Sequence, residues 1–417
     1  MFTRLIFAIV FAFIIDLINT FGLRKMLRRL KETYVYKLVI YLYWFLGIAL
    51  AIYFVIHFII TGYPGEDYKK YRSFFFIFGI FVLLYLPRIV YAIFVIWQSL
   101  YYMLKDWLKP NRGYVVRRNK RKNYLIQKIG LIFTILSFIS VLYGMIWGKS
   151  DFIVKENTIY FKDLPAGFDG FRIAQISDTH LGSFTDNSEV RKGLELLKEQ
   201  NADILIFTGD MVNNVAEEAV NYVDDFKTIN PEMGKFAILG NHDMGDYVKW
   251  KQADMKYSEI KQLVDVEEDM GFKMLLNENV ILRRNGDSIA LLGVENWGKP
   301  PFKQYGNLEK TMRGVEDVNF KILMTHDPSH FKLQVLDKTN IQLSFSGHTH
   351  GMQFGIDCCG IKWSPIKWLY PEWSGLYKFD NQYLYVNQGF GFLGMPARIG
   401  IRPEITIVTL RRGDGNE

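Results

Sequence analysis

The sequence has 417 residues, of which 49% are hydrophobic, and a formal net charge of +7. Residues 1–150 carry 21 Lys and Arg against 5 Asp and Glu, whereas the remaining residues carry 29 against 38. Because the more polar part of the chain is acidic, a nucleic-acid-binding domain with a basic face is not expected.

Four apolar stretches in the first 150 residues approach the roughly 20 residues that a helix needs to cross about 30 Å of hydrocarbon. They predict transmembrane helices at residues 5–23, 38–60, 74–99 and 125–147. The first stretch is too long for a cleaved signal peptide and contains Asp16 and Asn19 near its far end, so we expect it to be retained. Residues 1–150 are therefore predicted to form a membrane domain.

The third stretch is interrupted near its middle by Pro87 and Arg88, and an ionisable side chain is costly inside a membrane. We favour one kinked helix in which Arg88 pairs with Asp16 of the first helix, although Arg88 could instead line an ion or substrate path. A re-entrant hairpin is the other alternative, and it would reverse the topology.

Basic residues concentrate in residues 24–37 and 100–123, whereas the three in residues 61–73 are offset by Glu66 and Asp67. Positively charged loops stay in the cytoplasm, so the first and third loops are predicted to be inside. We therefore expect a multi-pass protein of a bacterial inner membrane whose C-terminal half faces the periplasm or exterior.

Residues 151–417 alternate short β-rich runs with helix-like segments, a pattern that is typical of an α/β domain. Five apolar runs, at 171–177, 203–209, 235–240, 320–325 and 341–347, each lead into a polar cluster. Ligands of open α/β sheets bind beyond the carboxyl ends of strands, so these clusters are expected to converge on one site. Five of the seven histidines fall in them, which a random scatter would not produce.

The clusters contain the ligand types that a pair of divalent cations such as Mn²⁺, Fe²⁺ or Zn²⁺ accepts. Asp178 and His180 can reach one metal, Asp210 can bridge, and Asn241 and His326 would supply much of the coordination of the second metal. Two such metals would promote phosphoester hydrolysis through attack by a bridging hydroxide.

His242 follows a proposed ligand but is itself free of that role. It is therefore predicted to stabilise phosphoryl charge or protonate the leaving oxygen, with Asp243 orienting its ring.

The ordered motif set resembles the calcineurin-like metallophosphoesterase family. Its elements are Asp178-Thr179-His180, Gly209-Asp210, Gly240-Asn241-His242-Asp243, His326 and Gly347-His348-Thr349-His350. The resemblance implies a sandwich of two mostly β sheets flanked by helices, with His242 as the catalytic histidine. It also implies that the first metal takes Asp178, His180, Asp210 and His350, and the second Asp210, Asn241, His326 and His348. Asn213 departs from the Asp that many members have there, a position that is not usually a ligand.

Residues 385–410 are similar to a membrane-bound or secreted bacterial subgroup of this family, represented by YkuE and YaeI. The helical region ahead of such a domain is also similar to transmembrane proteins with a metallophosphoesterase domain. Both resemblances imply attachment to a membrane.

The segment 360–377 carries three tryptophans together with Lys362 and Lys367, a composition that suits a lipid headgroup region. Contact with the bilayer or an acyl chain and an aromatic-packed loop are equally good interpretations. Cys358 and Cys359 are expected to pack rather than bind metal, and His330 to start a surface helix. Arg398 and Arg402 could contact substrate phosphate or form ordinary surface pairs.

The leading hypothesis is a membrane-anchored hydrolase of a phosphomonoester, phosphodiester or pyrophosphate, including a lipid-linked one. A UDP-diacylglucosamine pyrophosphatase is a second enzyme hypothesis, but that substrate is handled at the cytoplasmic face, opposite to the predicted topology. A non-catalytic metal-dependent sensor or scaffold for a phosphorylated partner is the alternative of another class, and the presence of His242 argues against it. A nuclease ranks last because the domain is acidic. No protein partner is indicated.

Overall fold

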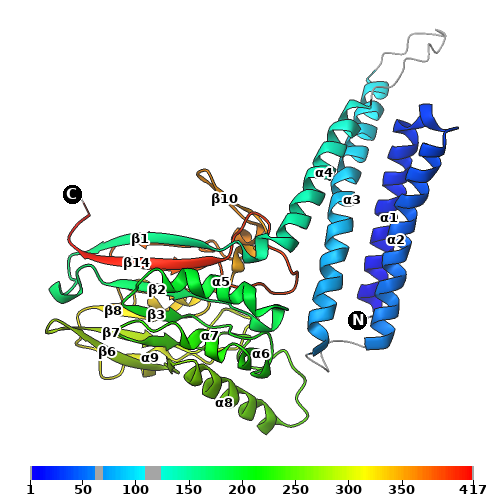
Figure 1. Ribbon diagram of the computed structural model, residues 1–417. Helices are drawn as coiled ribbons and strands as arrows, with labels where there is room; N and C mark the ends of the chain where they lie inside the picture. Colours follow the sequence, from blue (N-terminus) through cyan, green and yellow to red (C-terminus); the bar gives the residue numbers. More distant parts are fainter. Residues whose placement is uncertain (1, 62–68, 109–123, 416–417) are drawn as a thin grey trace. The chain divides into compact units, whose positions relative to one another are not determined.

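The computed structural model in Figure 1 describes residues 2–61, 69–108 and 124–415. The chain forms two compact units. The first comprises Met1–Tyr63 with Ser73–Tyr143, and the second comprises Pro64–Arg72 with Gly144–Glu417.

The first unit is built from long helices: α1 (Phe2–Met26), α2 (Tyr34–Thr61), α3 (Lys69–Trp107) and the greater part of α4 (Leu125–Ile146). Within the described residues, three segments are long and apolar enough to cross a membrane: Tyr34–His57, Tyr71–Trp107 and Leu125–Ile146. The predicted first span, residues 5–23, is helical as part of α1, but some of its side chains lie outside the described residues. The predicted loops 61–73 and 100–123 also lie partly outside them, so the four-span count and the sidedness stay predictions.

Helix α3 runs unbroken through Pro87, so the re-entrant alternative is wrong. The predicted pair is confirmed, because Arg88 Nη1 lies 2.9 Å from Asp16 Oδ1 and both residues are buried. The hydroxyls of Tyr43 and Tyr85 donate to the two Asp16 oxygens at 2.6 and 3.1 Å. A buried ion pair is tolerated when further hydrogen bonds satisfy it, as they do here.

The second unit contains two six-stranded sheets, which Figure 1 shows as two layers. The first has the order β1 (Ile153–Phe161), β14 (Glu404–Arg412), β2 (Arg172–Ile176), β3 (Ile204–Phe207), β4 (Lys235–Ala237), β5 (Phe272–Met274). The second has the order β12 (Gly375–Phe379), β13 (Gln382–Val386), β9 (Leu343–Ser346), β8 (Lys321–Met324), β7 (Asp287–Gly293), β6 (Glu278–Arg284). Strands β2 to β5 are parallel, as are β7, β8, β9 and β13.

Helices cover the outer faces of both sheets. Helices α5 (Asn187–Lys198), α7 (Val223–Lys227) and α8 (Ala253–Asp269) share a core with the first sheet, and α9 (Leu308–Met312) shares one with the second. In α5 the buried residues Val190, Leu194 and Leu197 recur at helical spacing, so one face of the helix packs on the sheet. Asp186 caps this helix by accepting the N–H of Ser188.

The core between the sheets is built from buried apolar side chains. Alternate residues of β2 and β3, such as Ile173 and Ile204, face Ile322 and Phe345 of the second sheet, and all four are fully buried. Strands buried on both faces read as continuous apolar runs, which is why the sequence marks them so clearly. The predicted fold class is confirmed: apolar helices precede an α/β domain with two multi-stranded sheets flanked by helices.

Candidate metal centre

The five predicted polar clusters follow five observed strands at their carboxyl ends. Strands β2, β3 and β4 of the first sheet and β8 and β9 of the second each end a few residues before one cluster. The site therefore draws its side chains from both layers of the sandwich, and the packing between the layers fixes the relative positions of these side chains.

Five site residues adopt the left-handed backbone conformation, which residues other than glycine rarely adopt. They are Asp178 (φ 54°), His180 (φ 44°), Asp210 (φ 63°), His348 (φ 72°) and His350 (φ 49°). Each costs about 1 kcal/mol or more, so the surroundings must hold it in place. The N–H of Asp178 donates to the Gly209 carbonyl (2.9 Å) and that of His180 to the Asp210 carbonyl (3.1 Å). Strain concentrated in this way is typical of functional sites.

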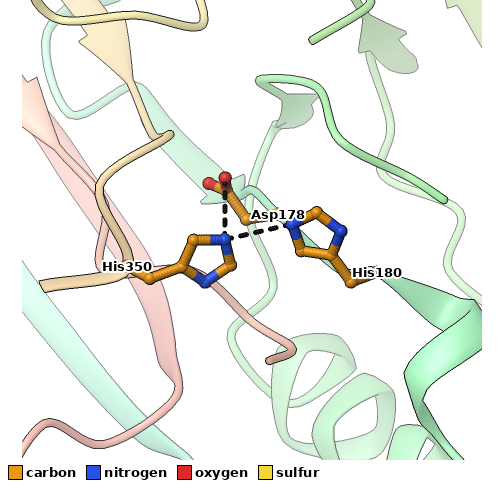
Figure 2. Close-up of side chains that lie close together, drawn as sticks. All are labelled: Asp178, His180 and His350. Carbon is orange, nitrogen blue, oxygen red and sulfur yellow. Dashed lines mark hydrogen bonds and ion pairs between the residues drawn. The ribbon is translucent and has the colours of Figure 1, made fainter. Parts of the chain in front are cut away.

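The first group of candidate ligands is Asp178, His180 and His350, and Figure 2 shows their side chains pointing toward one another. His350 Nε2 lies 3.3 Å from Asp178 Oδ1 and 3.0 Å from His180 Nε2. His180 Nδ1 lies 3.2 Å from the Val212 carbonyl, which can only accept, so Nδ1 carries the proton and Nε2 keeps its lone pair. Ring nitrogens and a carboxylate that face each other this closely fit a shared cation.

The second group is Asp210, His326 and His348, joined by the side-chain oxygen of Asn241. His326 Nδ1 donates to the Thr208 carbonyl (2.7 Å), so Nε2 faces Asp210 Oδ2 at 3.2 Å and Asn241 Oδ1 at 3.0 Å. His348 presents Nδ1, which lies 2.8 Å from Asn241 Oδ1 and 3.2 Å from His326 Nε2.

Asp210 lies between the two groups. Its Oδ2 is 3.6 Å from His180 Nε2 of the first group and 3.2 Å from His326 Nε2 of the second. A carboxylate in contact with ring nitrogens from both groups has the position that a bridging ligand requires.

The carboxylates favour positive charge among these rings. Burial opposes ionisation of Asp178, but the charge and hydrogen bond of His350 outweigh it and hold the pKa of Asp178 below its usual range. Burial by itself would lower the pKa of His326, yet the neighbouring Asp210 carboxylate raises it to about 10. For His180, burial dominates and lowers the pKa well below its usual value. Ionised carboxylates beside a neutral imidazole fit a divalent metal ion.

Two residues support His348: Asp327, which the sequence did not single out, and Tyr370 of the aromatic segment 360–377. His348 Nε2 lies 3.0 Å from the hydroxyl of Tyr370, which donates to Asp327 Oδ2 at 3.2 Å. The hydroxyl oxygen can then accept the Nε2 proton, which leaves Nδ1 unprotonated and facing the second group. Asp327 directly follows His326, and this adjacency was the only sequence signal for it.

His242 lies beside Asp210, whose Oδ1 accepts its backbone N–H at 2.8 Å. Its ring donates Nδ1–H to the Asn213 carbonyl (2.8 Å) and stacks on Tyr247 with centroids 4.4 Å apart. The prediction that Asp243 orients this ring is therefore wrong. The Asp243 carboxylate instead accepts backbone N–H groups from Asp210, Met211, Val212 and Gly240.

Three further expectations need correction. Arg398 is buried and donates to the carbonyls of Gln388, Gly389 and Gly391, so neither substrate contact nor surface pairing describes it. His330 does start a helix, Phe331–Val335, but it is buried against Trp297 rather than at the surface. Cys358 and Cys359 are exposed rather than packed. Arg402 does form the ordinary surface pair, with Asp151 at 2.8 Å.

The sequence is similar to known proteins over both units. A calcineurin-like phosphoesterase model matches residues 171–352, and a probable transmembrane domain of calcineurin-like phosphoesterases matches residues 3–149. The chain is 30% identical to the uncharacterized metallophosphoesterase YkuE of Bacillus subtilis, over 61% of this chain and 84% of YkuE. It is 25% identical to a transmembrane protein with metallophosphoesterase domain of Danio rerio, over 67% of this chain and 62% of that protein.

A third relative is the UDP-2,3-diacylglucosamine pyrophosphatase LpxG of Chlamydia muridarum, at 26% identity over 53% of this chain and 78% of LpxG. These matches agree with the apolar helices of the first unit and with the carboxylate and histidine groups at the strand ends of the second. The chain therefore belongs to the calcineurin-like phosphoesterase family, as a membrane protein with a metal-dependent phosphoester hydrolase domain.

Proposed function

We propose that the protein is a two-metal hydrolase of a lipid-linked phosphoester. The observation that carries the proposal is the position of Asp210, whose Oδ2 contacts ring nitrogens of both candidate ligand groups. A single metal site would not require a carboxylate between two separate sets of histidines.

The proposed first metal takes Asp178, His180, Asp210 and His350, and the second takes Asp210, Asn241, His326 and His348. Mn²⁺, Fe²⁺ and Zn²⁺ all accept this mixture of imidazole, carboxylate and amide oxygen. Two divalent cations would supply Lewis acidity toward the phosphoryl oxygens and lower the pKa of a bound water. Two ionised carboxylates neutralise only half of the charge of two such ions, so the site attracts an anionic phosphoryl group.

His242 is the residue that we assign to the leaving oxygen. The hydrogen bond from Nδ1 to the Asn213 carbonyl and the stacking on Tyr247 fix the ring, while its backbone N–H ties it to Asp210. Among the described residues Nε2 has no hydrogen-bond partner, so it is available to stabilise phosphoryl charge or to pass a proton. Asp243 is a positioning residue in this scheme, because it holds the backbone of Asp210.

Two observations support a lipid-linked substrate. The chain carries apolar helices long enough to span a membrane, and LpxG, by its name, hydrolyses the pyrophosphate of a diacylated sugar nucleotide. The concentration of basic residues in 24–37 and 100–123 supports an extracytoplasmic position of the hydrolase domain, which argues against that particular substrate here.

The test is hydrolysis of bis-p-nitrophenyl phosphate and p-nitrophenyl phosphate by the purified full-length protein with added Mn²⁺. Turnover is expected to require Mn²⁺ and to be lost in Asp210→Asn and His242→Ala. Asp224→Asn, the same change at an almost fully exposed carboxylate, is the matched control and should retain wild-type turnover. A folded protein that binds Mn²⁺ in both groups yet hydrolyses neither these esters nor phospholipids would instead support the binding-only sensor.

A further inference from the structure

Part of the second unit exposes an unusual amount of apolar surface. The hairpin of β10 (Ile356–Cys358) and β11 (Ile361–Trp363), which projects from the two-sheet body in Figure 1, leads into a short helical turn, Pro365–Trp368. The exposed apolar side chains of the hairpin, the turn and the residues next to them form what we call the apolar rim: Met352, Phe354, Ile356, Ile361, Trp368 and Leu369. Four of them are more than half exposed: Met352 at 54%, Ile361 at 58%, Trp368 at 71% and Leu369 at 61%. Soluble surfaces rarely gather large apolar side chains in this way unless they have a partner.

The rim is one connected surface. Ile356 pairs with Trp363 across the hairpin, and the Trp363 ring contacts the Trp368 ring edge-on with centroids 6.0 Å apart. The Ser364 hydroxyl donates to the Gly351 carbonyl at 2.8 Å, which ties the turn to the segment that begins the rim. The hairpin and the turn are therefore joined by direct contacts.

Hydrogen bonds within the second unit link the rim to Gly144, near the C-terminal end of α4. Gly144, in the last turn of α4, accepts a hydrogen bond from the Arg398 N–H at 3.2 Å and lies in the same compact unit as the rim. The next residue, Ile399, pairs with Phe354, and its carbonyl accepts the Gly355 N–H at 2.9 Å. A side chain at Gly144 would lie 2.7 Å from the Arg398 carbonyl, so this close approach depends on glycine. Arg398 and Ile399 thus link the last turn of α4 to the residues that precede the hairpin, through backbone hydrogen bonds.

We propose that the apolar rim inserts into the interfacial zone of the phospholipid bilayer that α4 crosses. A strand of three residues is about 10 Å long. The headgroup layer outside the hydrocarbon is roughly 5–8 Å thick, so a hairpin that starts at the end of the span has the right reach. Trp368 and Lys367 suit this zone, where tryptophan and lysine place an apolar body below a polar tip. Lys367 is exposed and forms no ion pair among the described residues, so it can meet a lipid phosphate.

The rim also continues into the candidate metal centre. Leu369 is followed by Tyr370, whose hydroxyl lies 3.0 Å from His348 Nε2, and the Leu369 carbonyl accepts from Lys299 Nζ at 2.7 Å. If the proposed function holds, a lipid can present its phosphoester to the site while its acyl chains stay in the bilayer. The rim itself would dock whether or not the site hydrolyses such a lipid.

The cysteines allow a direct test on the full chain, because the only two in the sequence lie at the tip of the hairpin. Cys358→Ser leaves Cys359 as a single thiol for an environment-sensitive fluorophore, and the labelled protein is reconstituted into phosphatidylcholine–phosphatidylglycerol vesicles. We expect the emission of the fluorophore to be blue-shifted. Most of its intensity should be quenched when the lipids carry a nitroxide near the headgroup. The matched control is Lys310→Cys in a chain with both native cysteines changed to Ser. Lys310 is exposed in α9, on the outer face of the second sheet, and its label should not be quenched.

A second variant separates docking from folding and from activity. Ile361→Glu with Trp368→Glu should abolish the quenching of the Cys359 label while leaving hydrolysis of soluble p-nitrophenyl esters unchanged. An unquenched, water-like emission at Cys359 in the otherwise wild-type chain would overturn the proposal. So would a blue-shifted emission that nitroxide lipids do not quench, since the rim would then be covered by protein. Quenching does not depend on turnover, so a failure of the proposed function would leave this result readable.

Discussion

Replacing Tyr370 by Phe tests whether the hydroxyl behind His348 prepares that ring for a metal. The change removes the oxygen that lies 3.0 Å from His348 Nε2 and 3.2 Å from Asp327 Oδ2, and leaves the buried ring in place. Losing such a supporting partner typically costs about 10- to 100-fold in metal affinity or activity. Asp327 Oδ2 already lies 3.6 Å from His348 Nε2, so a small shift could restore a direct hydrogen bond. We therefore expect Tyr370→Phe near the low end, about tenfold or ~1.4 kcal/mol. Asp327→Ala, which leaves no carboxylate, should lie nearer the high end.

The assay is the dissociation constant of Mn²⁺, measured by calorimetry on chelator-treated full-length protein and by titration of turnover. Tyr377→Phe is the matched control, because its hydroxyl also anchors this segment, by accepting the Trp373 N–H at 3.1 Å, but does not contact a histidine. A merely structural role of Tyr370 would lower the thermal midpoint in both variants and leave Mn²⁺ affinity unchanged. Wild-type Mn²⁺ affinity in both Tyr370→Phe and Asp327→Ala, or an equal loss in Tyr377→Phe, would refute the reasoning.

Three further predictions concern stability and metal dependence. Asp16→Ala should destabilise the first unit by about 3–5 kcal/mol, because it leaves Arg88 buried without its ion-pair partner. The double variant Asp16→Leu with Arg88→Met removes both charges, so it should melt in detergent at a higher temperature than Asp16→Ala. Burial lowers the pKa of Lys235 to about 8 from 10.5, so the unfolded chain binds more protons between these values, and stability should rise with pH across that window. The difference in thermal midpoint between wild type and Lys235→Met should change between pH 8 and 10.5, and a constant difference would contradict this. Treatment with EDTA should abolish turnover, and Mn²⁺ should restore it in wild type but not in Asp210→Asn.

The strands and the ligand clusters were predictable because burial and chemistry leave direct marks in the sequence. Strand β3 is apolar along its whole length and β2 is mostly apolar, and each is followed by a carboxylate or histidine motif that ordinary packing does not require. The pairing of Arg88 with Asp16 was predictable for a similar reason, since a charge inside a membrane span needs a partner.

What the sequence did not predict depends on long-range contacts and on backbone atoms. Asp327 and Tyr370 are 43 residues apart, and they meet only because the segment before β12 contacts the loop after β8. The partner of the His242 ring is the carbonyl of Asn213, and a carbonyl is present at every residue. Asn213 contributes to the site through its backbone carbonyl, so the lack of a carboxylate at this position does not affect the contact.

The correction at Asp243 gives a physical reason for an acidic residue at the end of the Gly240–Asp243 motif. Its Oδ2 accepts the N–H of Asp210 at 2.6 Å and the N–H of Gly240 at 2.8 Å, so one atom joins the loop after β3 to the loop after β4. Burial and the nearby Asp210 charge raise the pKa of Asp243 to about 7, while the backbone donors oppose that rise. Burial of the carboxylate is costly, and its hydrogen bonds to the backbone of the two loops offset that cost. Asp210 and Asn241, the oxygen ligands proposed for the second metal, owe their spacing to this link. The motif therefore specifies the geometry of the metal centre through the backbone, whereas the histidine ring beside it is set by a neighbouring carbonyl.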